Sequence, residues 1–425
     1  MNTLAQLKSG ALKGITHLKI AEGLTEFPLE IFELADTLEI LDLSDNQLSQ
    51  LPDNFSSLKK LSIAFFSDNL FTEFPLQLAS CERLQMIGFK SNRITKIAEN
   101  ALPKNTRWLI LTNNKITFLP KSIGDCWNLQ KCGLAGNALQ NIPTTLRQCE
   151  NLQLLRLASN QLRQLPEFLF EMPKLAWLAI DGNLFNQFKE NFNTDLQQFN
   201  WNHIETQELL GEGASGHIYK VKIDETEFAL KLFKGEVTSD GLPLSEMQAN
   251  IAFGEHTHLT KVIGKLSHHP ENKDGLVLDL IPSNYKNLGL PPSFKTCTRD
   301  TFVDGTQFTI VQIKTIAIGI ASACNHLHNQ GIMHGDLYAH NILVDENGHV
   351  LLGDFGAATL YNRAEDSNFK YEKLDVRAFG YLLDDLLNFV TDANTELKDI
   401  LTLKNNCLNS RVIDRPTFSE ILKTL

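Results

Sequence analysis

Two acidic residues and one amide in the second half of the chain have the types and spacing needed for phosphoryl transfer. Asp336 is followed five residues later by Asn341, and Asp354 comes after a short apolar segment that reads as a hairpin. Residues of these types can orient a hydroxyl nucleophile and hold Mg²⁺ against a triphosphate. The second half of the chain is therefore predicted to be a phosphotransferase.

A glycine-rich segment upstream could bind the phosphates. Residues 211–216 read G-x-G-x-x-G, and glycines let backbone N–H groups approach a phosphate closely. The next residues are strand-like at 219–223 and 228–233, whereas a dinucleotide-binding fold needs a helix there. Lys231 alternates with apolar residues in the second strand, which suits a cation that reaches phosphates. Each feature is weak evidence when taken alone. A single lysine in a strand, for example, usually lies at the edge of a sheet.

Composition limits the class of protein. The chain has 425 residues, 43% hydrophobic and 21% charged, which predicts a soluble globular protein of two domains. Its seven cysteines include no C-x-x-C pair and are predicted to be reduced and mostly buried. Nearly all of the net charge of −11 lies after residue 204, which argues against a nucleic-acid partner. No secretion signal or membrane span is expected, so the predicted location is cytoplasmic.

The first half is an internal repeat. Asparagines recur every 22 or 23 residues, at Asn46, Asn69, Asn92, Asn114, Asn137, Asn160 and Asn183. Each follows an L-x-L-like segment, which predicts a short strand, and the asparagine can bond backbone groups where the chain turns inward. This pattern resembles leucine-rich repeats. Residues 1–190 are therefore predicted to form a solenoid with terminal caps and a parallel concave sheet, whose leucines fill a core that no single repeat closes.

One row of residues is predicted to line the concave face. Six positions before each asparagine stand Ile40, Ile63, Met86, Trp108, Lys131, Leu154 and Trp177, and only one of them is charged. An apolar row on a surface commonly marks a protein contact. Two interpretations stay open, an external protein partner, which we prefer, and packing against the chain's own second domain.

The order of the pieces after residue 204 carries a resemblance. The glycine-rich hairpin, the strand lysine, the Asp-Asn loop and Asp-Phe-Gly resemble the eukaryotic-like protein kinase family from about Glu208 to Leu425. Residues 276–281 look like the hinge between lobes, residues 375–380 like the helix under the catalytic loop, and residues 414–418 like the closing helix. The fold expected is α/β multidomain: a repeat solenoid, a linker at 191–204, and a two-lobed α+β kinase-like domain at 205–425 with a short activation segment.

The resemblance implies ATP and Mg²⁺ and a role for each matching residue. Asp336 would orient the acceptor hydroxyl, Asn341 and Asp354 would hold Mg²⁺, and Lys231 would neutralise the phosphates. The ion-pair partner expected for Lys231 is Glu246, with Glu255 as the competing residue. The nucleotide contacts implied are Gly211, Glu212, Gly213, Ala214, Ser215, Gly216, Ile218, Ala229, Lys231, Leu278, Asp279, Leu280 and Leu343.

Several residues depart from the family pattern. Gly335 stands where many kinases have arginine, so control by phosphorylation of the activation loop is not expected. Tyr338 stands where a lysine commonly assists the γ-phosphate, and His340 is the candidate substitute. No Ala-Pro-Glu occurs between residues 354 and 375, which leaves Arg415 without its usual partner, and Glu372 is predicted to take that place.

Three functions remain open. A protein kinase acting on Ser or Thr, with the repeats binding a protein partner or substrate, is preferred on overall resemblance. His-Gly-Asp followed by Asn also resembles small-molecule phosphotransferases of the aminoglycoside and choline kinase type, which need no peptide groove. A catalytically inactive pseudokinase scaffold is the third, although the retention of Lys231, Asp336, Asn341 and Asp354 together speaks against it.

Overall fold

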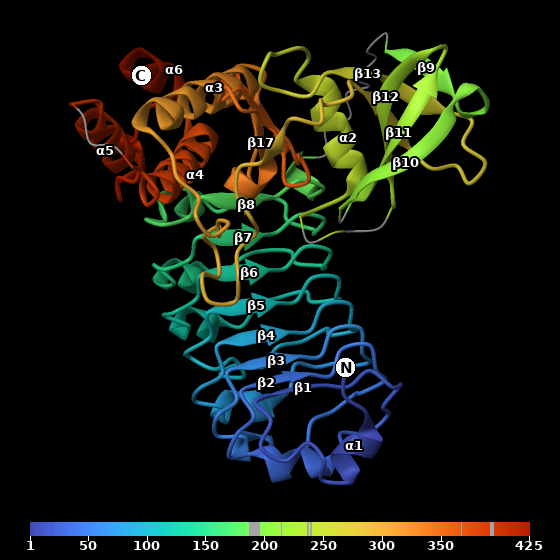
Figure 1. Ribbon diagram of the computed structural model, residues 1–425. Coiled ribbons are helices and arrows are strands. Elements are labelled where there is room, and N and C mark those ends of the chain that lie inside the picture. Colours follow the sequence, from blue (N-terminus) through green and yellow to red (C-terminus); the bar gives the residue numbers. More distant parts are fainter. Residues whose placement is uncertain (187–195, 214, 236–237, 239, 367, 392–394) are drawn as a thin grey trace. The chain divides into compact units, whose positions relative to one another are not determined.

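The computed structural model describes residues 1–186, 196–213, 215–235, 238, 240–366, 368–391 and 395–425 (Figure 1). Its internal contacts divide the chain into two units. Unit 1 comprises Met1–Met172 with Asn183–Phe185, and unit 2 comprises Pro173–Gly182 with Asn186–Leu425. The strand of the last repeat, β8 (Trp177–Ala179), therefore belongs to unit 2.

Unit 1 is the predicted solenoid. After the short helix α1 (Leu4–Lys8), parallel strands pair in sequence order, and each repeat keeps the register of the one before it. The strands are β1 (His17–Lys19), β2 (Ile40–Asp42), β3 (Ile63–Phe65), β4 (Met86–Gly88), β5 (Trp108–Ile110), β6 (Lys131–Gly133) and β7 (Leu154–Arg156). Short 3₁₀ helices, such as Leu76–Ser80 and Thr144–Gln148, return the chain on the other side.

The recurring asparagines hold successive repeats together. Asn69 Oδ1 accepts from the Leu48 backbone N–H at 2.8 Å, and its Nδ2 donates to the carbonyl oxygen of Leu43 at 2.9 Å. The other asparagines make the same bonds one repeat further on, and all seven are buried. Because a buried backbone group without a partner costs about 1–3 kcal/mol, the ladder is part of what makes the repeat fold. The bonding role predicted from the spacing is confirmed.

The predicted concave row is less exposed than its sequence suggested. Its members open the strands β2 to β8, but Ile63, Met86, Leu154 and Trp177 are buried and only Ile40, Trp108 and Lys131 are half-buried. Lys131 Nζ lies 4.4 Å from the centre of the Trp108 ring, a cation–π arrangement that further covers the indole.

The N-terminal lobe of unit 2 is a six-stranded sheet with the order β10-β11-β12-β14-β13-β9. The strands are β9 (Gln197–Asn200), β10 (Glu205–Glu212), β11 (Gly216–Ile223), β12 (Thr226–Phe233), β13 (Val262–Ser267) and β14 (Gly275–Leu278). Neighbours pair antiparallel, except that β9 runs parallel to β13. Helix α2 (Pro243–Ala252) belongs to the same lobe.

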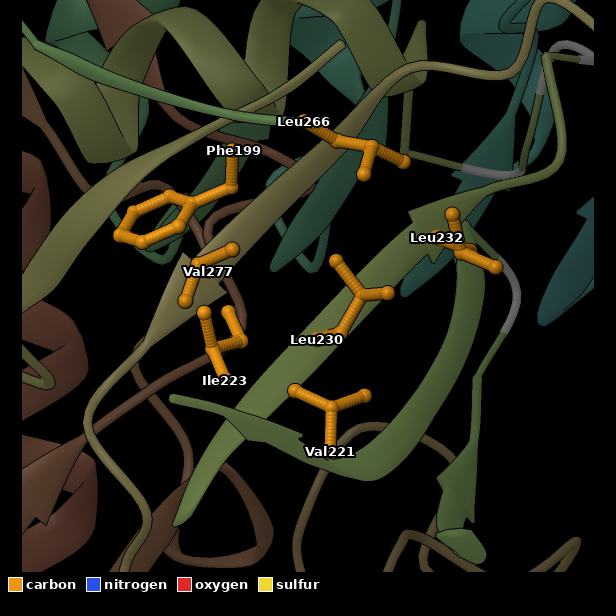
Figure 2. Packing of buried hydrophobic residues seen from close by; sticks show 7 residues of the cluster. All are labelled: Phe199, Val221, Ile223, Leu230, Leu232, Leu266 and Val277. Atoms are coloured by element: carbon orange, nitrogen blue, oxygen red, sulfur yellow. The ribbon is translucent and has the colours of Figure 1, made fainter. Parts of the chain in front are cut away.

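Strand β9 lies within the segment predicted as a linker, of which residues 191–195 fall outside the described part of the chain. Its residue Phe199 packs into the cluster shown in Figure 2, with Val221, Ile223, Leu230, Leu232, Leu266 and Val277. A Cβ on Gly264 would lie 2.3 Å from the carbonyl oxygen of Gln197, so glycine at this position lets β9 approach β13. Strand β9 is thus the edge strand beside β13, and its Phe199 is part of the core of the sheet.

The C-terminal lobe is mainly helical, with α3 (Ile310–Asn329), α4 (Lys370–Leu387), α5 (Thr395–Cys407) and α6 (Phe418–Thr424). The hairpin predicted around Asn347-Gly348 is confirmed as β17 (Ile342–Val344) and β18 (Val350–Leu352), and β15 (Lys286–Asn287) pairs with β17. A second small pair joins β16 (Ile332–Met333) to β19 (Thr359–Leu360). The predicted helix under the catalytic loop, residues 375–380, lies in α4.

Helix α3 is long and apolar enough to cross a membrane by length and composition alone. That is weak evidence, because 56% of its most apolar window is buried inside the protein, against α4, α6 and β18. Its apolar character is that of a core helix.

All seven cysteines are buried and unpaired, as predicted. Burial raises the pKa of Cys407 to about 12, so its thiol is protonated and unreactive at neutral pH.

Candidate active site

Lys231 and Glu246 form the ion pair predicted from the sequence. In β12 the neighbours Leu230 and Leu232 point into the cluster of Figure 2, which turns Lys231 to the opposite face of the sheet. There its Nζ pairs with Oε1 of Glu246, a buried residue in the first turn of α2. The competing candidate Glu255 pairs instead with Lys261 at 2.6 Å.

Asn341 is bonded to Asp336. Its Nδ2 donates to Oδ2 of Asp336 and to the carbonyl oxygen of the same residue, both at 2.9 Å. Because Nδ2 of Asn341 faces Asp336, its Oδ1 faces away from Asp336 and can bind a cation. The spacing of five residues therefore produces one carboxylate–amide unit.

Helix α4 holds the backbone that leads into Asp336 through its residue Asp375. The carboxylate of Asp375, fully buried, accepts from the backbone N–H groups of His334 at 2.7 Å and Gly335 at 3.0 Å. It also bonds Nε2 of His328 at 2.9 Å. Since a buried carboxylate is costly unless it is hydrogen-bonded, these contacts fix the backbone just before Asp336.

Asp354 is brought next to Asn341 through the backbone. The N–H of Gly353 donates to the carbonyl oxygen of Asn341 at 2.9 Å, so Asp354 follows directly on that contact. Asp354 has a φ of +53°, a left-handed conformation that non-glycine residues adopt mainly at constrained sites. Phe355 is buried, with its ring centre 4.8 Å from that of Phe253 and 5.0 Å from that of His334.

The glycine-rich segment is the turn between β10 and β11. The N–H of Gly213 donates to the carbonyl oxygen of Gly216 at 2.9 Å. A Cβ on Gly211 or Gly213 would meet no atom within 4 Å, which leaves an open side for a ligand, whereas a Cβ on Gly216 would lie 2.3 Å from the carbonyl oxygen of Leu232. Glu212 bonds Lys234 at 2.7 Å. Ser215 is buried, and Ala214 lies outside the described residues.

The apolar residues predicted to contact the nucleotide come from several strands. Ile218 lies on β11, Ala229 on β12 and Leu343 on β17. Ala229 is directly opposite Leu278 in the β12–β14 pairing. Asp279 and Leu280 follow the end of β14, and the N–H of Asp279 donates to the backbone carbonyl oxygen of Lys261 at 3.0 Å.

The residues present fit Mg²⁺ and a triphosphate. Carboxylate and amide oxygens, the groups offered by Asp354 and Asn341, are the protein ligands that Mg²⁺ prefers, and it usually takes its other ligands from phosphates and water. In the described part of the chain no group of three or more His, Cys, Asp or Glu residues could hold a metal by itself.

Tyr338 does not take the place of the phosphate-binding lysine. Its side chain is buried, and its ring stacks on that of Trp177 with centres 4.3 Å apart and planes 7° apart. His340, the other candidate, bonds Oδ1 of Asp300 through Nδ1 at 2.7 Å. Burial lowers the pKa of His340, but the bond to Asp300 and the nearby carboxylates outweigh burial, and the pKa is raised above its usual value.

The predicted Arg415–Glu372 pair is wrong. Arg415 donates instead to the carbonyl oxygens of Lys373, Asn409 and Pro173, at 2.9, 2.9 and 3.3 Å. Glu372 accepts from the N–H of Phe418 at 2.7 Å and lies 3.5 Å from Arg363, because the first turn of α4 directs it to the start of α6. Burial lowers the pKa of Arg415 to about 9.

Sequence reasoning missed two contributors to this region. Asp300 lies in a segment without a recognisable motif, and only the fold brings it to His340. Trp177 was placed in the concave row of the repeats, and for this residue the second interpretation holds, since its ring packs on Tyr338 within unit 2. The apolar row itself was the signal in the sequence that pointed to such a contact.

Family models match both parts of the chain. The model of the protein kinase domain matches residues 204–378, and that of the leucine-rich repeat matches residues 37–58. The chain contains a protein kinase domain. The match begins at the start of β10 and continues into α4, so it includes the glycine-rich turn, the Lys231–Glu246 pair and the Asp336–Asn341 unit.

Curated relatives resemble this kinase domain at modest identity. The serine/threonine-protein kinase AtPK1/AtPK6 of Arabidopsis thaliana is 31% identical over 171 residues, 39% of this chain and 34% of the relative. The probable receptor-like protein kinase At5g20050 of the same plant is 32% identical over 37% of this chain and 35% of its own. The LRR receptor-like serine/threonine-protein kinase GSO2, also from Arabidopsis thaliana, is 26% identical over 41% of this chain and 14% of its own. The chain thus spans about a third or less of the length of these relatives.

Proposed function

We propose that the protein transfers the γ-phosphoryl group of Mg²⁺-bound ATP to a Ser or Thr hydroxyl of a protein. The observation that carries this proposal is the formed ion pair between Lys231 and Glu246. In protein kinases this pair must be in place for catalysis, and a scaffold that only binds partners has no need to bury it. The serine/threonine preference rests on the names of the relatives.

The residues of the loop define the chemical step. Asn341 holds one carboxylate oxygen of Asp336 and so orients the carboxylate. Asp336 would accept the proton of the acceptor hydroxyl while the new O–P bond forms and the bond from the γ-phosphorus to the ADP oxygen breaks. Lys231 would neutralise the α- and β-phosphates. Asn341 and Asp354 would hold Mg²⁺, which when bound balances the negative charge of the β- and γ-phosphates.

The repeats would select the protein on which the kinase acts. Leucine-rich repeats commonly bind proteins on their concave surface. In this chain a partner could bind through the half-buried Ile40, Trp108 and Lys131 of the concave row and through Phe65 and Ile110, which stand two positions further along β3 and β5. A cytoplasmic location is part of the proposal, supported by seven buried thiols without a disulfide.

Phosphate transfer from labelled ATP by the purified full chain tests the proposal. The reaction is run with a generic protein acceptor and, separately, with small alcohols, and Asp336→Asn serves as the inactive control. Labelled protein with the wild type and none with the variant supports a protein kinase. Transfer to small alcohols alone would identify a small-molecule phosphotransferase, and nucleotide binding without transfer would identify a scaffold. Either of these two results overturns the proposal.

A further inference from the structure

The strand of the last repeat contacts the catalytic loop inside unit 2. Trp177 in β8 is 1% exposed, and its Nε1–H donates to the carbonyl oxygen of Leu337 at 3.0 Å. The same indole stacks on Tyr338 and, with ring centres 5.2 Å apart, on Tyr381 of α4. Leu337 and Tyr338 directly follow Asp336, so this one side chain restrains the backbone next to the proposed base by a hydrogen bond and by stacking.

Gly335 lies close to the backbone of the same strand. Its φ is +71°, and a Cβ at this position would lie 2.5 Å from the carbonyl oxygen of Leu178 and 2.9 Å from that of Ala357. No side chain fits at residue 335 while β8 lies there, including the arginine common in the kinases that the chain resembles. The glycine before Asp336 is thus explained by the close approach of β8.

Two further contacts join the segment Pro173–Gly182 to the rest of unit 2. Arg415 donates to the carbonyl oxygen of Pro173. A backbone carbonyl of the last repeat thus takes one of the hydrogen bonds that an acidic partner would otherwise accept from Arg415. The carboxylate of Asp181 hydrogen-bonds Ser245 in α2, and burial raises the pKa of Asp181. The segment therefore reaches both the helix that carries Glu246 and the neighbourhood of the closing helix.

We propose that Pro173–Gly182 is a built-in positioning element of the catalytic loop, with Trp177 as its principal positioning residue. In many kinases a phosphorylated activation segment orders the site. Here that segment is short and lacks its arginine partner, and a segment of the last repeat takes over the ordering without a phosphate. This inference rests on the proposed function. Trp177 acts through Leu337 and Tyr338 and touches no reacting atom.

Steady-state kinetics of the full chain test the positioning role. Trp177→Phe keeps a ring for stacking but removes the N–H donor, and Trp177→Ala removes both. We expect kcat to fall about fivefold in the first variant and tenfold or more in the second, with KM for ATP unchanged. The matched control is Trp201→Phe, whose ring packs on the cluster of Figure 2 and on His269, away from the loop. It should keep the wild-type kcat. An increase of kcat in either Trp177 variant would mean that β8 inhibits, and would overturn the proposal.

Tyr338→Lys separates positioning from charge. It restores the residue common in the family but removes the stacking partner of Trp177. The proposal expects a lower kcat, whereas a higher kcat would show that Tyr338 is only a poor substitute for lysine and would contradict the proposal.

Hydrogen exchange gives a readout that does not depend on activity. Amides in residues 334–341 should exchange at least about tenfold faster in Trp177→Phe and Trp177→Ala than in the wild type, and at the wild-type rate in Trp201→Phe. Unchanged exchange in both Trp177 variants overturns the inference. If Trp177→Ala does not fold, Trp177→Phe decides. If the wild type transfers no phosphate but exchange responds as expected, the proposed function fails while the positioning of the loop stands.

Discussion

The two units of this protein are stabilised in different ways. In unit 1 the same contacts recur from repeat to repeat, so that Asn69, Asn92 and Asn137 bond equivalent backbone groups. In unit 2 the contacts do not recur, and several of them join residues far apart in sequence, such as Asp375 with His334 or Trp177 with Leu337. We therefore expect a repeated contact of unit 1 to contribute about the same free energy of unfolding in every repeat. The contribution of a contact in unit 2 is expected to differ from one contact to the next.

The largest effect is expected at Asp336, the carboxylate proposed to accept the proton. Asp336→Asn preserves the shape of the side chain but removes its ability to accept a proton, so kcat should fall by about 10²–10⁴-fold. The stability of the protein should change little, because an amide can still bond Asn341. Kinetics with labelled ATP and thermal unfolding measure the two quantities. A variant with more than a tenth of the wild-type kcat would contradict the role assigned to Asp336.

The next effect is at Gly335, where conformation and space act together. Gly335→Ala introduces a Cβ at a positive φ and against the backbone of Leu178, and should lower the free energy of unfolding by about 3 kcal/mol or more. Gly254→Ala is the matched control, since Gly254 has the same φ of +71° but no atom within 4 Å of a Cβ. Its cost should be only about 1–2 kcal/mol. Urea unfolding compares them, and equal losses would mean that β8 does not approach Gly335.

The asparagine ladder tests whether repeats are equivalent. Asn69→Ala, Asn92→Ala and Asn137→Ala should each cost about 1–3 kcal/mol, because each leaves buried backbone groups without a partner. The three values should agree within about 1 kcal/mol. Asn54→Ala, at an exposed position, is the control and should cost less than about 0.5 kcal/mol. Widely different values, measured by urea unfolding, would show that the repeats are not interchangeable.

The smallest effect concerns pH. Burial, together with His326 and His258, lowers the pKa of His256 to about 4, whereas an unfolded histidine has its ordinary pKa of about 6.5. Between these values the unfolded chain binds more protons, so this contribution to stability is present above about pH 6.5 and is lost as the pH falls towards 4. His256→Gln should be less sensitive to acid over this range in thermal unfolding measured at several pH values. An identical acid profile in both proteins would show that His256 is not responsible.

Much of the candidate site could be predicted because the arrangement of its residues depends on short spacings along the sequence. The five-residue interval fixes Asn341 on Asp336, the hairpin turn at Asn347-Gly348 returns the chain to Asp354, and alternation in β12 turns Lys231 away from the core. The Lys231–Glu246 pair was also predicted correctly. The partner of Arg415 was not, because backbone carbonyl oxygens leave no trace in a sequence, and neither was Asp300, which carries no motif.

By itself the sequence determined the repeat period, the strands of the repeats, the buried leucines and the order of the elements that resemble those of protein kinases. Each of these follows from periodicity or from short spacings along the chain, where backbone geometry leaves few alternatives. Only the tertiary structure decided what Trp177, Tyr338 and Gly335 do, and that β9 completes the sheet beside β13. These contacts join segments more than sixty residues apart, and their formation depends on side-chain packing that the folded chain as a whole selects.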